Sequence, residues 1–413
     1  MTDSTAQAPA AVREFDITLE AVILLVLGIF MGLFGLLLFP IYAGTLGYSP
    51  DSTYGLFLVI VALQVILMGK TPFGTIRRSW ILIITGIAAG IIGMVACFIP
   101  GALSGIVHTL VGALLLLGGA VLLLQLILNK EKAATWLRVP GVLRHLTIAC
   151  GIVYLMAFLL GLVTLVPALT NGTLTSVLLI IDAAGLFYLA GCIQLVERRY
   201  PGRGMAGPLA GDEGELPVLL RDAPIPFTTA LLIFLGVLLS LLAVLLVPVG
   251  LGIIPFSADG QLGLLLVIMA VQVLAMGETP VGQFRRSWPI VLIGLIFVVL
   301  GVFSCIVPGI TTDMNRVMLG LLNLAGGVIP LIQRAIPIVH DLRNPPAVPV
   351  QIPPQLKNLL ITQTVLNIVG ILFGLSMLLP GMIPGLVIAG ILFMNGLLLF
   401  VLAYILSTLP APE

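Results

Sequence analysis

The chain has 413 residues, of which 60% are hydrophobic and 8% are charged. Soluble domains carry roughly 25% charged residues, so a water-soluble protein is excluded. The net charge of +1 leaves no concentrated basic surface, which argues against a nucleic-acid partner. The mean hydropathy of +1.24 predicts a protein whose solvent is the lipid of a membrane.

The N-terminal segment, residues 1–18, is polar and has no basic stretch that leads into a short apolar region with a small-residue cleavage site. We therefore expect no signal peptide. The four cysteines all lie in apolar runs, without a CxxC or a Cys/His cluster: Cys97, Cys150, Cys192 and Cys305. We interpret them as small core residues and expect neither a metal nor a cofactor.

Apolar runs predict an all-α, polytopic membrane protein with about twelve transmembrane helices. Two of the runs are short, but they stand at equivalent places in an internal repeat, so we count both as spanning. The runs lie at about 19–40, 54–69, 80–100, 105–128, 146–167, 174–195, 227–248, 262–277, 288–308, 317–333, 358–380 and 385–407.

The basic residues predict the orientation, because Lys and Arg near helix ends are retained on the cytoplasmic side. Seventeen of the eighteen lie in the N-terminal tail or in loops after even-numbered helices. Only Arg316 falls among the loops after odd-numbered helices. We expect a multi-pass protein of the cell (inner or plasma) membrane with both termini in the cytoplasm.

The chain contains an internal duplication, which appears when it is compared with itself 208 positions along. The best window, MGKTPFGTIRRSW at 68–80 against MGETPVGQFRRSW at 276–288, shares nine of thirteen residues. Each copy has an even number of helices, so both enter the membrane from the same side. The pseudo-two-fold axis should therefore run along the membrane normal, which disfavours an inverted repeat.

This pattern divides the chain into two six-helix membrane repeats in parallel orientation. A polar stretch rich in Gly and Pro separates them and is typical of a linker. The predicted parts are a cytoplasmic tail at 1–18, the first repeat at 19–196, a cytoplasmic linker at 197–226, the second repeat at 227–408 and a C-terminal tail at 409–413.

A helical hairpin recurs six times within the two repeats. Each odd-numbered helix is expected to end on the outer side at a proline, since proline cannot continue the helix, and an even-numbered helix then returns. The prolines are Pro40, Pro100, Pro167, Pro248, Pro308 and Pro380.

The segment at 286–332, RSWPIVLIGLIFVVLGVFSCIVPGITTDMNRVMLGLLNLAGGVIPLI, resembles the hairpin repeat of the HdeD-like acid-resistance membrane proteins. Shared features are a basic-Trp entry, a Gly-spaced helix that ends in Pro-Gly, and a Gly-rich return helix, and they recur at 78–128. Members of that family have about half as many helices, so the chain resembles a duplicated, double-length member. The resemblance implies a non-enzymatic membrane protein associated with acid stress.

Asp182 is the only acidic residue well inside an apolar run. Carboxylates within a membrane are costly and indicate a functional site by default, here for a proton or a cation. The alternative is a protonated Asp182 that hydrogen-bonds a neighbouring helix. Other polar side chains deep enough to join such a site are Asn323, Asn395, Gln64 and Gln272.

Two further pairs occupy equivalent positions in the repeats. His108 and Arg316 lie near the outer ends of even-numbered helices, where an imidazole could sense external acid or a cationic pair could meet an anion. Lys70 and Glu278 carry opposite charges at the cytoplasmic side, where they could form a latch between the halves. The alternatives are an interfacial polar residue and solvated, unpaired charges.

The duplicated RRSW segments place cations and an indole at the cytoplasmic interface, where headgroups anchor them. They comprise Arg77, Arg78, Trp80, Arg285, Arg286 and Trp288. Major-facilitator transporters also carry Gly and basic motifs in these loops, but the acidic residue expected between the glycines is absent here. Topology anchoring is the favoured interpretation.

Three functions remain open. The first is a non-enzymatic HdeD-like protein of envelope or acid stress, and the second is a proton- or cation-coupled transporter with a parallel six-plus-six layout. The third is a cofactor-free structural subunit of a larger membrane complex. Expected partners are membrane lipids, with other integral membrane subunits or a homo-oligomer as alternatives. No nucleophile and base pair, carboxylate dyad or metal cluster indicates an enzyme.

The orientation can be tested with one cysteine placed at Gly207, in the predicted linker. We expect it to resist a membrane-impermeant thiol reagent added outside intact cells and to react once the membrane is opened, because the linker lies on the side rich in Lys and Arg. Labelling from outside would invert the topology.

Overall fold

The computed structural model describes residues 17–68, 79–128, 136, 141–166, 168, 171–199, 225–275, 288–343 and 354–408. Twelve long α-helices account for most of these residues, as predicted. They are α1 (Leu19–Tyr42), α2 (Pro50–Met68), α3 (Trp80–Phe98), α4 (Ser104–Leu128), α6 (Val142–Leu165), α7 (Gly172–Arg199), α8 (Phe227–Gly250), α9 (Ala258–Ala275), α10 (Trp288–Ile306), α11 (Thr312–Arg343), α12 (Pro354–Leu378) and α13 (Gly385–Thr408).

Ten of these helices are long and apolar enough to cross a membrane. The remaining two, α9 and α10, are shorter apolar helices and correspond to α2 and α3 of the first repeat, which do qualify. The prediction of a multi-pass, all-α membrane protein is confirmed.

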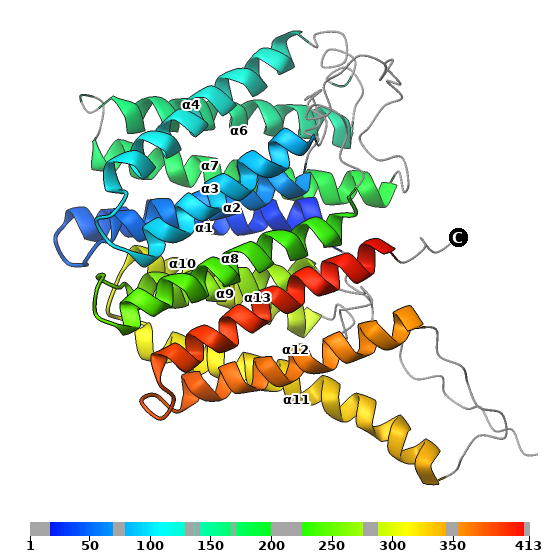
Figure 1. Ribbon diagram of the computed structural model, residues 1–413. Helices are drawn as coiled ribbons and strands as arrows, with labels where there is room; N and C mark the ends of the chain where they lie inside the picture. The colour runs from blue at the N-terminus through cyan, green and yellow to red at the C-terminus, as the bar shows by residue number, and fades with distance from the viewer. Residues whose placement is uncertain are drawn as a thin grey trace, which may run out of the picture.

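The short connections that the structure describes lie at one end of the helix bundle (Figure 1). We call this end the turn face; it joins α1 to α2, α3 to α4, α6 to α7, α8 to α9, α10 to α11 and α12 to α13. The end of α13 lies at the opposite end, which we call the termini face. In the topology expected from the sequence, the turn face is external.

Two predicted helix ends are wrong. Pro40 and Pro248 lie inside α1 and α8, which continue to Tyr42 and Gly250. A proline removes one intrahelical hydrogen bond, and the helix tolerates this loss in its last turn, where few bonds follow. Similarly, α7 extends to Arg199, so the first residues of the predicted 197–226 linker are helical.

The helices pack in antiparallel pairs. The most extensive contacts are those of α8 with α13 and of α1 with α7, and the pairs α2 and α3, α4 and α6, α11 and α12, and α9 and α10 follow closely. Among partners joined by the turns, α3 and α4 touch little, whereas α6 and α7 pack extensively. The predicted architecture of helical hairpins is confirmed, and the hairpins also pack side by side through pairs such as α1 and α7.

Glycines set these pairings. A Cβ on Gly55 of α2 would lie 2.5 Å from the carbonyl oxygen of Gly93 on α3, and one on Gly263 of α9 would lie 2.5 Å from that of Gly301 on α10. No side chain separates the two backbones at either place. Such contact is the main source of helix association in lipid, where apolar burial contributes little.

The contacts also define which residues of the repeats correspond. In the first four helices of each repeat, equivalent residues are 208 positions apart. In the last two helices they are 213 positions apart, as shown by Phe187, which packs on Gly28 in the same way as Phe400 packs on Gly236. By the same offset, Asp182 corresponds to Asn395.

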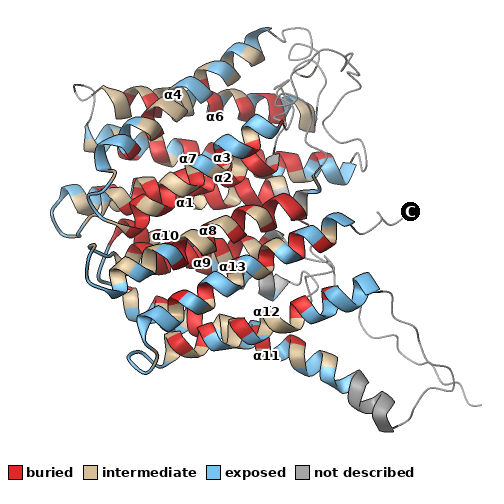
Figure 2. Ribbon diagram, in the orientation of Figure 1, coloured by how far each residue is buried: buried red, intermediate tan, exposed pale blue. Residues whose placement is uncertain are grey.

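The repeats meet through α1, α2 and α3 of one and α8, α9 and α10 of the other. Ser49 donates its backbone N–H to the Ile306 carbonyl at 3.0 Å, and the equivalent Ser257 donates to the Phe98 carbonyl at 3.0 Å. The central helices are largely buried (Figure 2). Reciprocal bonds of this kind are expected around a two-fold axis.

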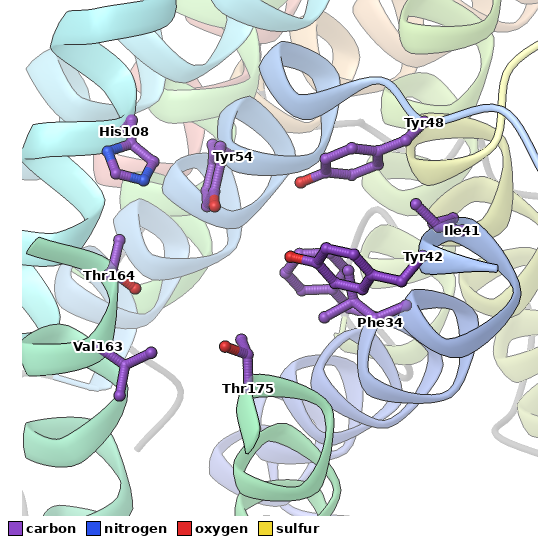
Figure 3. A pocket seen from close by; sticks show the side chains of 10 residues that line it. Phe34, Ile41, Tyr42, Tyr48, Tyr54, His108, Val163, Thr164 and Thr175 are labelled. Atoms are coloured by element: carbon purple, nitrogen blue, oxygen red, sulfur yellow. The ribbon is translucent and has the colours of Figure 1, made fainter. Parts of the chain in front are cut away.

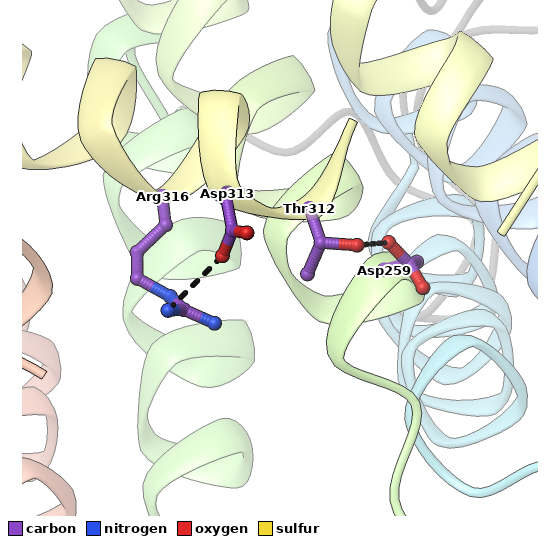
Figure 4. A network of polar contacts seen from close by, with 4 residues as sticks. All are labelled: Asp259, Thr312, Asp313 and Arg316. Atoms are coloured by element: carbon purple, nitrogen blue, oxygen red, sulfur yellow. Dashed lines mark hydrogen bonds and ion pairs between the residues drawn. The ribbon is translucent and has the colours of Figure 1, made fainter. Parts of the chain in front are cut away.

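An aspartate fastens one turn in each repeat. Asp51 accepts hydrogen bonds from the Gly101 N–H at 2.7 Å and the Ser104 hydroxyl at 3.0 Å. The equivalent Asp259 accepts from the Gly309 N–H at 3.0 Å and from the Thr312 hydroxyl (Figure 4). Gly101 and Gly309 have φ of 83° and 85°, which only glycine adopts readily. In each repeat, two hydrogen bonds to one carboxylate therefore hold the Pro-Gly turn.

We expect Asp259→Ala to lower the free energy of unfolding by about 1.5 to 3 kcal/mol, because a charged acceptor of two hydrogen bonds is lost. Asp313→Ala is the matched control: that side chain is 92% exposed and forms an ion pair with Arg316, three residues along. It should have little effect. Thermal unfolding in detergent compares the variants, and equal losses of stability would show that the two bonds of Asp259 do not stabilise the turn.

Candidate functional site

A cavity of about 140 Å³ opens at the turn face of the first repeat (Figure 3). Five hydroxyl groups and one imidazole supply its polar lining: Tyr42, Tyr48, Tyr54, Thr164, Thr175 and His108. We call it the hydroxyl cavity. Apolar side chains complete the wall: Phe34, Leu38, Ile41 and Val163. The lining comes from α1, α2, α4, α6, α7 and the turn between α1 and α2.

Close packing holds the aromatic side chains in place. The ring of Tyr42 lies over the start of α7, where a Cβ on Gly172 would approach it within 2.4 Å. Any larger residue at 172 would displace this ring. Phe34 stacks on Tyr48 with ring centroids 6.1 Å apart, and Tyr54 meets His108 edge to face at 5.3 Å. These contacts preorganise the cavity wall.

Tyr48 and Tyr54 are neighbours in the wall of the cavity, and their phenol groups influence each other. Burial raises the pKa of Tyr48 far above its ordinary value, and the neighbouring Tyr54 adds to this rise. Tyr48 therefore remains a neutral phenol, able to donate a hydrogen bond, at any physiological pH.

Thr175 carries a hydroxyl that its surroundings leave unsatisfied. Threonines in helices commonly donate to the carbonyl four residues earlier, as Thr164 does to Leu160 at 2.7 Å. The Thr175 Oγ1 atom is buried and has no hydrogen-bond partner within the described ranges. In Figure 3 this hydroxyl points toward the middle of the cavity. A buried hydroxyl without a partner costs about 1 to 3 kcal/mol, so the site favours an occupant that can bind it.

A smaller chamber of about 40 Å³ lies deeper and shares Phe34, Tyr54, Thr164 and Thr175 with the hydroxyl cavity. Its other walls are apolar: Phe30, Met31, Phe57, Val111, Leu115, Leu160 and Leu179. One face of α7 carries Thr175, Leu179 and Asp182 in succession, at the spacing of helical turns. Asp182 thus lies one turn beyond the floor of the chamber.

Asp182 is 3% exposed, and its Oδ1 atom makes no hydrogen bond to any residue that the structure describes. The sequence predicted a buried acid here, and the burial is confirmed. A bonded partner on a neighbouring helix, the alternative interpretation, is not found for Oδ1 among the described residues.

The other predicted intramembrane polar residues lie apart from Asp182. Asn323 on α11 donates from Nδ2 to the Leu319 carbonyl at 2.8 Å and to the Met269 sulfur at 3.3 Å, within the second repeat. Gln64 and Gln272 are half-buried on α2 and α9. Asn395 lies on α13, which packs against α8 and α12, whereas α7 packs against α1 and α6.

The equivalent residues His108 and Arg316 have different surroundings. His108 lines the hydroxyl cavity, while Arg316 pairs with Asp313 at 3.3 Å (Figure 4). They belong to different repeats and lie in separate environments. Of the two, His108 is the residue that lines the hydroxyl cavity.

Most of the predicted cytoplasmic residues lie outside the described residues. These are the latch residues Lys70 and Glu278 and the anchors Arg77, Arg78, Arg285 and Arg286. Of the two tryptophans, Trp80 begins α3 and is partly exposed, and Trp288 begins α10.

The second repeat does not reproduce the lining of the hydroxyl cavity. At the equivalent positions all five hydroxyl-bearing residues are replaced by apolar residues or glycine, and the histidine is replaced by arginine. Their counterparts are Gly250, Phe256, Leu262, Met377 and Ile388 for Tyr42, Tyr48, Tyr54, Thr164 and Thr175, and Arg316 for His108. The framework glycines and aspartates, in contrast, are present in both copies.

Sequence reasoning missed the tyrosines and threonines of this cavity and found only His108. Tyrosine and threonine are common in membrane helices and carry no charge, so they give no strong signal. A comparison of the repeats, position by position, would have identified them as polar differences within a shared framework.

No group of three or more His, Cys, Asp or Glu side chains among the described residues could hold a metal ion. Comparison of the chain with protein-family models, curated proteins and solved structures finds no match. The site must therefore be interpreted from its own chemistry.

We expect Asp182→Asn to fold with an unchanged or higher melting temperature. The second repeat already carries an amide at the equivalent Asn395, and the substitution removes the cost of a buried ionisable group. Asp182→Leu is the comparison variant, because it changes shape and polarity together. Thermal unfolding in detergent measures both, and a large loss in Asp182→Asn would show that the carboxylate makes a specific stabilising contact.

Proposed function

We propose that this protein is a non-enzymatic membrane protein that takes up a small solute from the turn face into the hydroxyl cavity of its first repeat. One observation carries the proposal: two copies of one framework differ at all the polar lining positions of one cavity. Framework residues are explained by packing, and the cavity residues are not.

The free-energy cost of placing polar side chains within a membrane protein supports this interpretation. Polar side chains within a membrane protein are expensive unless they are paired, so they are retained where they serve a pathway or a site. Hydroxyls such as that of Thr175 add nothing to helix packing that the apolar Ile388 does not supply at the equivalent position. Ligand binding accounts for the difference.

The depth of the site favours transport over simple binding. The hydroxyl cavity is followed by the apolar chamber and then by Asp182 on the same face of α7. A solute at the cavity would lie on a line that leads from the turn face toward a buried acid. This arrangement supports the transporter hypothesis, with Asp182 as the group that would couple a proton or a cation to movement.

The HdeD-like family remains our proposal for ancestry, with a role in envelope or acid stress. Its support is the recurring hairpin with a Pro-Gly turn, held here by Asp51 in one repeat and Asp259 in the other. We further propose that both termini are cytoplasmic, so that the cavity opens to the outside of an inner or plasma membrane.

Access to the cavity can be tested with Thr175→Cys and a small, membrane-impermeant methanethiosulfonate reagent. We expect this thiol to react from the turn-face side at least about tenfold faster than Ile388→Cys, since reaction requires a water-accessible thiolate. Ile388 is the matched control because it occupies the equivalent place in the second repeat. The four native cysteines are buried and should contribute little background.

Equal rates for the two variants would contradict the proposal. Reaction of Thr175→Cys only from the termini-face side would contradict the direction of entry.

A further inference from the structure

We infer that the occupant of the hydroxyl cavity is a small, uncharged solute with several hydroxyl or amide groups, about the size of a three-carbon polyol. This inference rests on the proposed function, because it names the chemical class of the solute for the same site. It follows from the charge, the hydrogen-bonding groups and the volume of the cavity.

The first step concerns charge. The described residues that line the cavity include no Asp, Glu, Lys or Arg, and His108 is the one imidazole among them. While His108 is neutral, a charged solute would leave water without meeting an opposite charge, and such burial costs several kcal/mol per ion. The nearest acid along α7 is Asp182, which lies beyond Leu179, below the floor of the inner chamber. The cavity itself therefore selects for neutral solutes.

The second step concerns hydrogen bonding. A hydroxyl group both donates and accepts, and five such groups surround the same space. Tyr42, Thr164 and Thr175 direct their oxygens toward the middle, and the neighbouring Tyr48 and Tyr54 lie at the edge (Figure 3). A solute with alternating donors and acceptors, such as a polyol or an amide, matches this lining best.

An organic cation held by aromatic rings is the main competing class. Binding of that kind places the cation over ring faces. Here Phe34 covers Tyr48 by stacking, and Tyr54 and His108 contact each other edge to face. These rings use their faces on one another and present hydroxyl groups to the space.

The third step concerns size. A cavity of about 140 Å³ holds several water molecules, since one water needs roughly 10–15 Å³ of such space. Small solutes such as glycerol and urea fit within it. The carbon skeleton of a polyol would pack against Phe34 and Leu38, and its hydroxyls would face Thr175 and the tyrosines.

The experiment uses the full chain in liposomes and measures shrinkage and reswelling after a glycerol or urea gradient. We expect solute entry above that of empty liposomes. The double variant Tyr54→Phe with Thr175→Val should lower this entry about thirtyfold, because two lost hydrogen bonds of about 1 kcal/mol each correspond to that factor at about 1.4 kcal/mol per tenfold.

Two controls separate chemistry from folding. With Tyr54 unchanged, Thr175→Ser retains the hydroxyl and should keep most of the solute entry of the parent protein. Thr175→Val alone should reduce this entry. Tyr404→Phe removes a phenol that is 71% exposed on α13 and should change nothing. Melting temperatures in detergent verify that each variant is folded.

The outcomes distinguish this inference from the proposed function. Cavity-dependent entry of glycerol or urea, with no entry of choline or lactate, supports it. Entry of choline or lactate that depends on Tyr54 and Thr175 overturns the neutral class but leaves a solute site. No entry of glycerol or urea above empty liposomes also overturns it, while labelling of Thr175→Cys still decides the proposed function separately.

Discussion

Direct contact between helix backbones is the interaction on which this structure depends. In lipid, apolar side chains gain little by burial against one another, so association relies on close packing. Glycine supplies it at every principal helix pair: Gly55 with Gly93, Gly263 with Gly301, Gly161 against the backbone at Leu116, and Gly374 against that at Leu324. With the hairpins fixed in this way, the turn-face aspartates only need to orient the Pro-Gly turns. The remaining surface, such as the exposed leucines of α4, is free to face lipid.

Duplication allows one copy to diverge while the fold persists. The interface between repeats uses equivalent residues from both, including the reciprocal bonds of Ser49 and Ser257. The cavity is lined by the first repeat alone, from α1, α2, α4, α6, α7 and the turn that carries Tyr48. The reciprocal bonds of Ser49 and Ser257 are made by backbone atoms, so changes in the side chains of the cavity leave these bonds in place. A polar cavity in one half and an apolar counterpart in the other can coexist on one framework.

The class of fold and the helix count could be predicted from the sequence because hydropathy and length reflect a single constraint, the satisfaction of backbone groups in lipid. Which helices pair could not, since this depends on the angular position of Gly55 or Gly161 on a helix face that is apolar all round. Asp182 was found because a charge is conspicuous. Tyr48 and Thr175 were missed because their role comes from convergence of five helices and a turn, which no local pattern encodes. The grouping of Asp182 with Asn323 failed for the same reason: both are deep, but they belong to different repeats.

The correspondence between Asp182 and Asn395 narrows what the carboxylate can do. If the position only required a polar group of that shape, the amide in the second repeat would serve both copies, and the two side chains are nearly isosteric. The first repeat has an ionisable group there, and it is also the repeat with the hydroxyl cavity two turns above. Two of the polar differences between the copies, Thr175 and Asp182, thus lie on one face of α7. A neutral solute in the cavity would carry no charge of its own, so any dependence of its movement on a proton or a cation would have to come from Asp182.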